Sequence, residues 1–121
     1  MNSVRVAVVQ DAPAAFDLDA SLDKAAALVA QAARQGAQLV VFPEAFVAGY
    51  PKGIDFGARV GMRLPQGREW FRRYYESAVD VPGPATIRLG DAARQHGVWL
   101  VMGVIERDGG TLYCTVLFFA P

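Results

Sequence analysis

The pattern that organises this chain lies in Gln38-Leu39-Val40-Val41-Phe42-Pro43-Glu44. Four consecutive apolar residues, 39–42, are typical of a strand that is buried on both faces. Pro43 ends the strand, because proline has no N–H to donate to a neighbouring strand. Glu44 is therefore expected at the carboxyl end of a buried strand, where open α/β sheets bind their ligands.

The segments before this strand complete a strand–helix–strand unit. Residues 4–10 are β-branched and nearly continuous in apolar character, which predicts a first buried strand. A helix is predicted over residues 19–35, with Asp19 or Ser21 as its N-cap and Gly36 in a left-handed conformation after its end. Two strands joined by a helix in this way pair in parallel through a right-handed crossover.

The rest of the chain is predicted to contain a long loop, two helices and a hairpin. Residues 45–68 include five glycines and two prolines, which is typical of an irregular loop, and loops of this length are commonly functional. The first of the two helices carries several aromatic residues along one side, and we expect this side to pack on another element. The two helices are predicted over residues 68–78 and 84–96, and the two strands of the hairpin over residues 98–105 and 112–119.

Composition excludes several classes of protein. Hydrophobic residues make up 53% of the chain, and 12 basic residues balance 12 acidic ones, so no charged surface for nucleic acid or an anionic membrane is expected. No apolar stretch approaches the ~20 residues of a membrane span, and the N-terminus does not resemble a signal peptide. A single cysteine, Cys114, excludes an internal disulfide. We therefore expect a cytoplasmic protein that binds neither nucleic acid nor membrane.

Glu44 is the residue for which the sequence most directly suggests chemistry. Its apolar neighbours predict a poorly hydrated carboxylate, and loss of hydration raises a carboxyl pKa, which suits a general base near neutral pH. The alternative is a glutamate on a surface loop. Tyr50, six residues later, is a candidate for lining the entrance of a substrate pocket, or else for packing the loop.

Two further side chains, Cys114 and His96, are interpreted as structural. Cys114 falls within a predicted strand, away from any helix N-terminus that would stabilise a thiolate, so we expect a buried, small apolar residue and not a nucleophile. His96 is expected to end a helix, where its ring interacts well with the helix dipole. A Cys114–His96 dyad is the hydrolase alternative. One histidine and one cysteine make no metal ligand set, and the glycines form no phosphate-binding motif, so neither a metal nor a cofactor is expected.

Residues 36–51 resemble the first active-site motif of the nitrilase superfamily of carbon–nitrogen hydrolases over its full length. The glycine, the apolar strand, the glutamate and Gly49-Tyr50-Pro51 are all present. The resemblance covers essentially the whole chain. Residues 52–53, 56–59 and 77–84 resemble nitrilases proper more than the related amidases, and residues 103–107 and 110–113 complete the similarity.

The resemblance implies hydrolysis of an organic nitrile to a carboxylic acid and ammonia, without a cofactor. In the family a cysteine attacks the nitrile carbon to give a thioimidate and then a thioester, a lysine stabilises the developing charge, and a glutamate is the general base and acid. Glu44 matches that glutamate, whereas Lys24, Lys52 and Cys114 do not stand in the family's lysine and cysteine motifs, which are expected downstream of Pro121. We therefore expect the 121-residue chain alone to be inactive. The alternatives are an amidase or carbamoyl-type hydrolase, and a non-catalytic remnant that acts only by association.

The implied fold is α/β, the N-terminal part of a four-layer α-β-β-α sandwich that is incomplete in this chain. Residues 1–121 are expected to form the N-terminal portion of a single carbon–nitrogen hydrolase domain. An uncovered sheet face and apolar edges are templates for association, so a homo-oligomer is expected, with a small-molecule nitrile as substrate.

Overall fold

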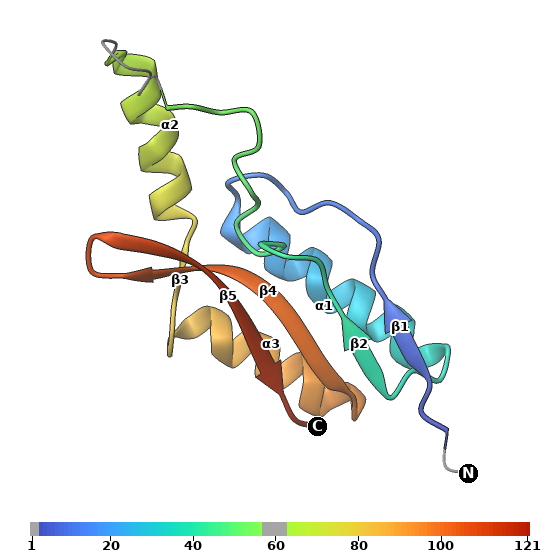
Figure 1. The fold of residues 1–121 in the computed structure, drawn as a ribbon. Helices are drawn as coiled ribbons and strands as arrows, with labels where there is room; N and C mark the ends of the chain where they lie inside the picture. The colour runs from blue at the N-terminus through green and yellow to red at the C-terminus, as the bar shows by residue number, and fades with distance from the viewer. Residues whose placement is uncertain (1–2, 57–62) are drawn as a thin grey trace.

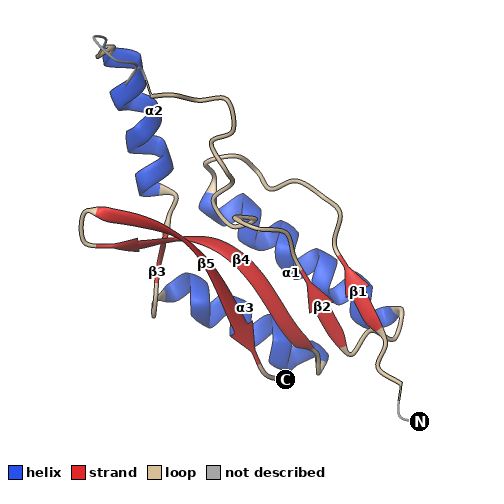
Figure 2. Ribbon diagram, viewed as in Figure 1, coloured by secondary structure: helices blue, strands red, loops and turns tan. Residues whose placement is uncertain are grey.

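The computed structural model describes residues 3–56 and 63–121. Residues 57–59 of the nitrilase-like stretch 56–59, and part of the predicted loop 45–68, lie outside the described residues. Figures 1 and 2 show the elements in chain order: β1 (Val6–Val8), α1 (Leu18–Arg34), β2 (Leu39–Val41), α2 (Pro65–Glu76), β3 (Val79–Asp80), α3 (Pro84–His96), β4 (Trp99–Asp108) and β5 (Thr111–Phe119).

The described strands form one five-stranded sheet in which β4 is the central strand. β1, β2 and β4 are parallel, with Val6 opposite Leu39 and Leu39 opposite Trp99. One edge of β4 pairs in turn with β2, with Val47 and with β3. Its other edge pairs with the whole length of β5, which is antiparallel to it. The predicted parallel crossover unit and the predicted C-terminal hairpin are both confirmed. The short strand β3 was not predicted.

Helices α1 and α3 lie together on one face of the sheet (Figure 1). Arg88 of α3 joins the two helices at the surface through ion pairs to Asp19 (2.9 Å) and Asp23 (2.6 Å) of α1. This face, which we call the closed face, holds the larger apolar core. The core brings together residues of both helices and of the strands beneath them: Leu22, Val29, Leu89, Val40, Leu100, Met102 and Val104.

The N-cap of α1 differs from the prediction. Its cap is Asp17, whose carboxylate accepts a hydrogen bond from the N–H of Ala20 at 2.9 Å. Asp19 and Ser21 lie inside the first turn, so the two predicted caps are wrong by two and four positions. The helix end is as predicted, because Gly36 follows it with φ of 84°, a conformation that glycine adopts without a steric penalty.

Neither α1 nor α3 covers the opposite face, which we call the open face (Figure 1). Among the described residues it is covered only at one end, where Ile105 is buried in a small cluster with Tyr74 of α2 and with Ala45 and Ala48. Strand register places Val6, Val8, Trp99, Val116 and Phe118 on the open face, and they are 48%, 70%, 55%, 53% and 74% exposed. The prediction that residues 4–10 form a strand buried on both faces is therefore wrong for β1 in the described chain. The side chains are apolar on both sides, but packing covers one side.

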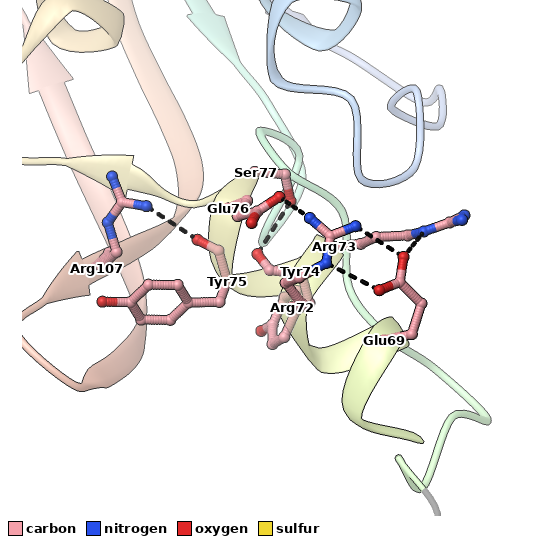
Figure 3. Close-up of polar contacts among 8 residues, drawn as sticks. All are labelled: Glu69, Arg72, Arg73, Tyr74, Tyr75, Glu76, Ser77 and Arg107. Atoms are coloured by element: carbon pink, nitrogen blue, oxygen red, sulfur yellow. Dashed lines mark hydrogen bonds and ion pairs between the residues drawn. The ribbon is translucent and has the colours of Figure 1, made fainter. Parts of the chain in front are cut away.

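Helix α2 stands away from the sheet and is held by aromatic contacts. It begins at Pro65, three residues before the predicted start, because proline is well suited to the first turn. Tyr74 is buried, with ring centroids 5.8 Å from Phe16 and 5.9 Å from Phe56, so the predicted packing of the aromatic side is confirmed. Arg107 of β4 donates a hydrogen bond to the backbone carbonyl of Tyr75 at the end of the helix (3.2 Å, Figure 3).

None of the helices within residues 3–56 and 63–121 has both the length and the apolar character needed to cross a membrane.

Candidate active site

Glu44 follows the carboxyl end of β2, as predicted, and lies in a loop that is fastened to β4 at both ends. The N–H of Phe42 donates to the carbonyl of Val101 (2.9 Å), and the N–H of Val47 donates to the carbonyl of Gly103 (3.1 Å). Between these two hydrogen bonds, β4 advances by two residues, from 101 to 103, whereas the segment bonded to it advances by five, from 42 to 47. The surplus residues, 43–46, must leave the sheet, and they carry Glu44 with them.

The backbone of this loop is held in uncommon conformations. Ala45 has φ of 51° and Ala48 has φ of 85°, in the left-handed region that residues other than glycine rarely occupy. A hydrogen bond from the N–H of Gly49 to the carbonyl of Ala45 closes the turn at 3.0 Å. Such residues cost on the order of 1–3 kcal/mol each and persist where the surrounding structure enforces them, commonly at functional sites.

The side chains after Glu44 turn inward, and Glu44 itself turns outward. Residues 45–48 are at most 1% exposed, whereas Glu44 is exposed. The predicted poorly hydrated carboxylate is therefore wrong for the described chain. The apolar neighbours that motivated it fill the interior beneath the loop and do not surround the carboxylate.

Gly103 of β4 lies directly beneath Glu44 and was not predicted to take part in the site. A Cβ at this position would stand 2.8 Å from the Cα of Glu44 and closer still to the backbone on either side of it. A glycine inside a predicted strand is a signal for the close approach of another backbone. That signal was present in residues 98–105, but the sequence does not say which segment approaches.

Cys114 of β5 is the second residue that the fold brings to Glu44. It pairs with Ile105, and the register places both on the open face. Partial loss of hydration raises the pKa of the Cys114 thiol, although the residue is exposed, and the charge of Glu44 and a hydrogen bond to Glu44 raise it further. Burial likewise raises the pKa of Tyr74, with smaller contributions from Cys114 and Tyr50. Glu44, Cys114, Tyr74 and Tyr50 thus form one neighbourhood at the end of the sheet.

The burial expected for Cys114 needs correction, and the alternative dyad with His96 is not formed. Cys114 is exposed, so it is not the buried apolar residue that its place in a strand suggested. His96 ends α3 just before β4 begins at Trp99, and Cys114 lies opposite Ile105, six positions farther along β4. At ~3.3 Å per strand residue the separation is roughly 20 Å, so the Cys114–His96 dyad is wrong.

The other predicted or possible site residues are placed as follows. Tyr50 is 62% exposed, so it does not pack the interior of the loop, and its contact with substrate stays a prediction. The ammonium group of Lys24 bonds the carboxylate of Asp11 (2.8 Å) and the carbonyl of Ala12 (2.6 Å), which fixes it at the start of the chain's first loop. Among the described residues, no three His, Cys, Asp or Glu side chains are grouped so that they could hold a metal ion.

Known protein sequences resemble this chain along its whole length. The model of the carbon–nitrogen hydrolase family matches residues 5–121. A bifunctional nitrilase/nitrile hydratase of Nicotiana tabacum is 59% identical over 117 residues, which are 97% of this chain and 34% of that protein. An aliphatic nitrilase of Sinorhizobium fredii (strain HH103) is 50% identical over 121 residues, 100% of this chain and 39% of that protein. The chain thus spans little more than a third of the length of these relatives.

Solved structures give the same fold. XC1258 of Xanthomonas campestris, a CN-hydrolase superfamily protein, has a TM-score of 0.72 at 21% identity, covering 100% of this chain and 38% of that one. An amidase of Nesterenkonia sp. has a TM-score of 0.65 at 25% identity, covering 97% of this chain and 38% of that one. With a family match over residues 5–121, the chain belongs to the carbon–nitrogen hydrolase family.

Proposed function

We propose that this chain supplies the general base, Glu44, of an enzyme that hydrolyses organic nitriles to carboxylic acids and ammonia. The observation that carries the proposal is the place of Glu44: at the carboxyl end of β2, in a loop fastened to β4, within a sixteen-residue match to the family's first active-site motif. The named relatives at 50–59% identity are nitrilases, which favours a nitrile as substrate.

In the proposed reaction Glu44 carries protons between the nucleophile, the nitrogen and water. Its carboxylate takes the proton of a cysteine thiol as the sulfur attacks the nitrile carbon, and the nitrogen of the resulting thioimidate is protonated. Water adds, ammonia leaves, and a second water hydrolyses the thioester, so that one nitrile and two waters give one acid and one ammonia. The nucleophile and the charge-stabilising lysine have no counterpart among residues 1–121.

The architecture supports the same assignment. We propose that residues 1–121 are the N-terminal portion of one four-layer domain, in which α1 and α3 form an outer layer and a second sheet packs on the open face. The exposed apolar side chains of that face, Val8, Trp99 and Phe118 among them, suit burial against another apolar layer. Glu44 and Cys114 lie on the same face, so the reaction would take place at the junction of the two sheets.

The test is the change Glu44→Gln in the proposed enzyme, a full-length protein that carries residues 1–121. Glutamine keeps the size of the side chain and removes the base, and loss of general acid–base catalysis costs roughly 10²–10⁴-fold in kcat. Ammonia release from aliphatic and aromatic nitriles measures turnover, and circular dichroism checks the fold. We expect purified 121-residue chain to release no ammonia. Turnover by that chain that is abolished by Cys114→Ala would instead make Cys114 the nucleophile.

A matched control is Glu76→Gln, because Glu76 is an exposed acid at the end of α2 whose side chain bonds Arg72 at the surface (Figure 3). It should leave kcat within about twofold of wild type, since exposed substitutions usually change little. Glu106, an acid of β4, is less suitable as a control: it is half-buried and its carboxylate accepts a hydrogen bond from Thr115 (2.7 Å). Retention of most turnover by Glu44→Gln would remove the functional assignment.

Amide hydrolysis is the second candidate, favoured by the similarity to the Nesterenkonia amidase over 97% of this chain. The same panel therefore includes the amides that correspond to each nitrile, and both amide and acid products are measured, because one relative is named a nitrilase/nitrile hydratase. Faster turnover of amides than of nitriles would favour this candidate. No turnover by any protein carrying this sequence would favour a non-catalytic role in association.

A further inference from the structure

Gly103 is the point at which β4 and the loop that carries Glu44 come closest. A Cβ built on Gly103 would lie 2.3 Å from the carbonyl oxygen of Pro43, 2.7 Å from the nitrogen of Ala45 and 2.8 Å from the Cα of Glu44. All three are backbone atoms, so none can swing aside as the end of a flexible side chain would. A side chain at position 103 and the present place of Glu44 therefore exclude each other.

The requirement for glycine here is one of space and not of backbone conformation. Gly103 is not among the glycines with positive φ, so its backbone would accept any residue. Hydrogen bonds on both sides of the close approach hold the loop on β4: the N–H of Phe42 donates to the carbonyl of Val101 (2.9 Å), and the N–H of Val47 donates to the carbonyl of Gly103 (3.1 Å). The loop cannot rise to make room for a methyl group without straining these bonds.

We propose that Gly103 is a positioning residue for Glu44: its missing side chain lets residues 43–45 lie directly on β4, and this contact sets where the carboxylate stands on the open face. The consequence for turnover rests on the proposed role of Glu44 as general base. The placement itself does not, and it is measurable without turnover.

Cys114 provides that measurement, because it is the single cysteine of the 121 residues and its thiol lies beside Glu44. The rate of alkylation by iodoacetamide as a function of pH gives the pKa of the thiol, since the thiolate is the reactive form. Glu44→Gln removes the neighbouring charge and sets the reference, a shift of the thiol titration to lower pH. Gly103→Ala should also shift the titration to lower pH, because it moves Glu44 away.

The matched control is Gly110→Ala in the β4–β5 turn. A Cβ there meets nothing within 4 Å, and Gly110 has no positive φ, so the thiol should titrate as in wild type. In the double variant Gly103→Ala/Glu44→Gln, the thiol titration should shift little beyond its position in Glu44→Gln alone, because two changes that act through one group are not additive. Full additivity would mean that Gly103 acts on the thiol independently of Glu44, against the proposal.

A folded Gly103→Ala chain with the wild-type thiol titration overturns the proposal, and so does an unshifted titration in Glu44→Gln. Should circular dichroism find Gly103→Ala unfolded in buffer, the titration is carried out in sucrose, which favours the compact state. In the proposed full-length enzyme, Gly103→Ala should lower kcat by about 10²-fold with KM little changed, as expected for a misplaced catalytic group. A shifted thiol with normal turnover would leave the positioning intact and remove Glu44 as the base.

Discussion

The face of the sheet beneath α1 and α3 is closed by packed side chains, whereas the open face leaves Val8, Trp99 and Phe118 more than half exposed. The closed face carries no group to which we assign chemistry. The open face carries Glu44, in the loop that lies on Gly103 of β4, and Cys114 of β5, which pairs with Ile105 of β4. One face therefore holds the fold together and the other holds the candidate site, and the two should respond differently to the same kind of substitution.

The largest effect on stability is expected on the closed face. Leu100 is 1% exposed on β4, within the core formed with α1 and α3. Leu100→Ala should lower the free energy of unfolding by about 2–5 kcal/mol, the combined effect of lost burial and of the cavity that remains. Urea unfolding followed by circular dichroism measures this change. A loss below about 1 kcal/mol would mean that this face is not the core of the domain.

Sequence patterns predicted the closed face far better than the open one. The helical spacing of α1 and the glycines after α1 and α3 gave these helices nearly their observed bounds, because amphipathic periodicity and helix-ending glycines are local signals. The strand sequences are instead apolar on both sides. A continuous apolar run predicts a buried strand, but it does not tell which side the described chain leaves open; Val8, for example, is exposed.

The candidate site shows the same limit. The sequence predicted that Glu44 follows a strand end, because proline and the apolar run are neighbours in the chain. It did not predict that Glu44 points outward, since that depends on two left-handed alanines, Ala45 and Ala48, which carry no local signal for such a conformation. The approach of Gly103 comes from the pairing of β2 with β4, between residues 60 positions apart, and periodicity does not encode that pairing. Cys114 reaches Glu44 because its predicted hairpin partner is this same strand, β4.

On the open face, replacing Phe118 should affect stability less than replacing Leu100 does, although Phe118 has the larger side chain. Phe118 is 74% exposed, so Phe118→Asp is expected to change the free energy of unfolding by no more than about 0.5 kcal/mol. Its effect should appear in association, because exposed apolar patches on sheets promote contacts between molecules. Light scattering should find oligomers or aggregates of the 121-residue chain and a smaller mean mass for the variant.

Two outcomes would break this part of the comparison. A monodisperse wild-type monomer with a cooperative melt would mean that the open face needs no cover. A loss of stability in Phe118→Asp as large as that in Leu100→Ala would mean that Phe118 is packed in solution, and the two faces would then be alike.

The smallest effect is expected on the outer side of α2, which belongs to neither face. There Arg72 bonds both Glu69 (2.7 Å) and Glu76, and Arg73 bonds Glu69 (3.0 Å), as Figure 3 shows. Hydrogen bonds from Arg72, then from Arg73, lower the pKa of Glu69 from 4.5 to about 2. A carboxyl pKa lowered in the folded state contributes stability that is fully present above pH 4.5 and is lost as pH falls towards 2.

The contribution should be small, because these side chains are about half exposed and water and salt screen their charges. We expect wild type to melt slightly above Glu69→Gln at pH values above 4.5, and the difference to vanish near pH 2. Thermal melts of both proteins over that pH range, at low and high salt, measure it. A difference that stays constant with pH, or that grows in high salt, would show that Glu69 acts through packing on α2 and not through its charge.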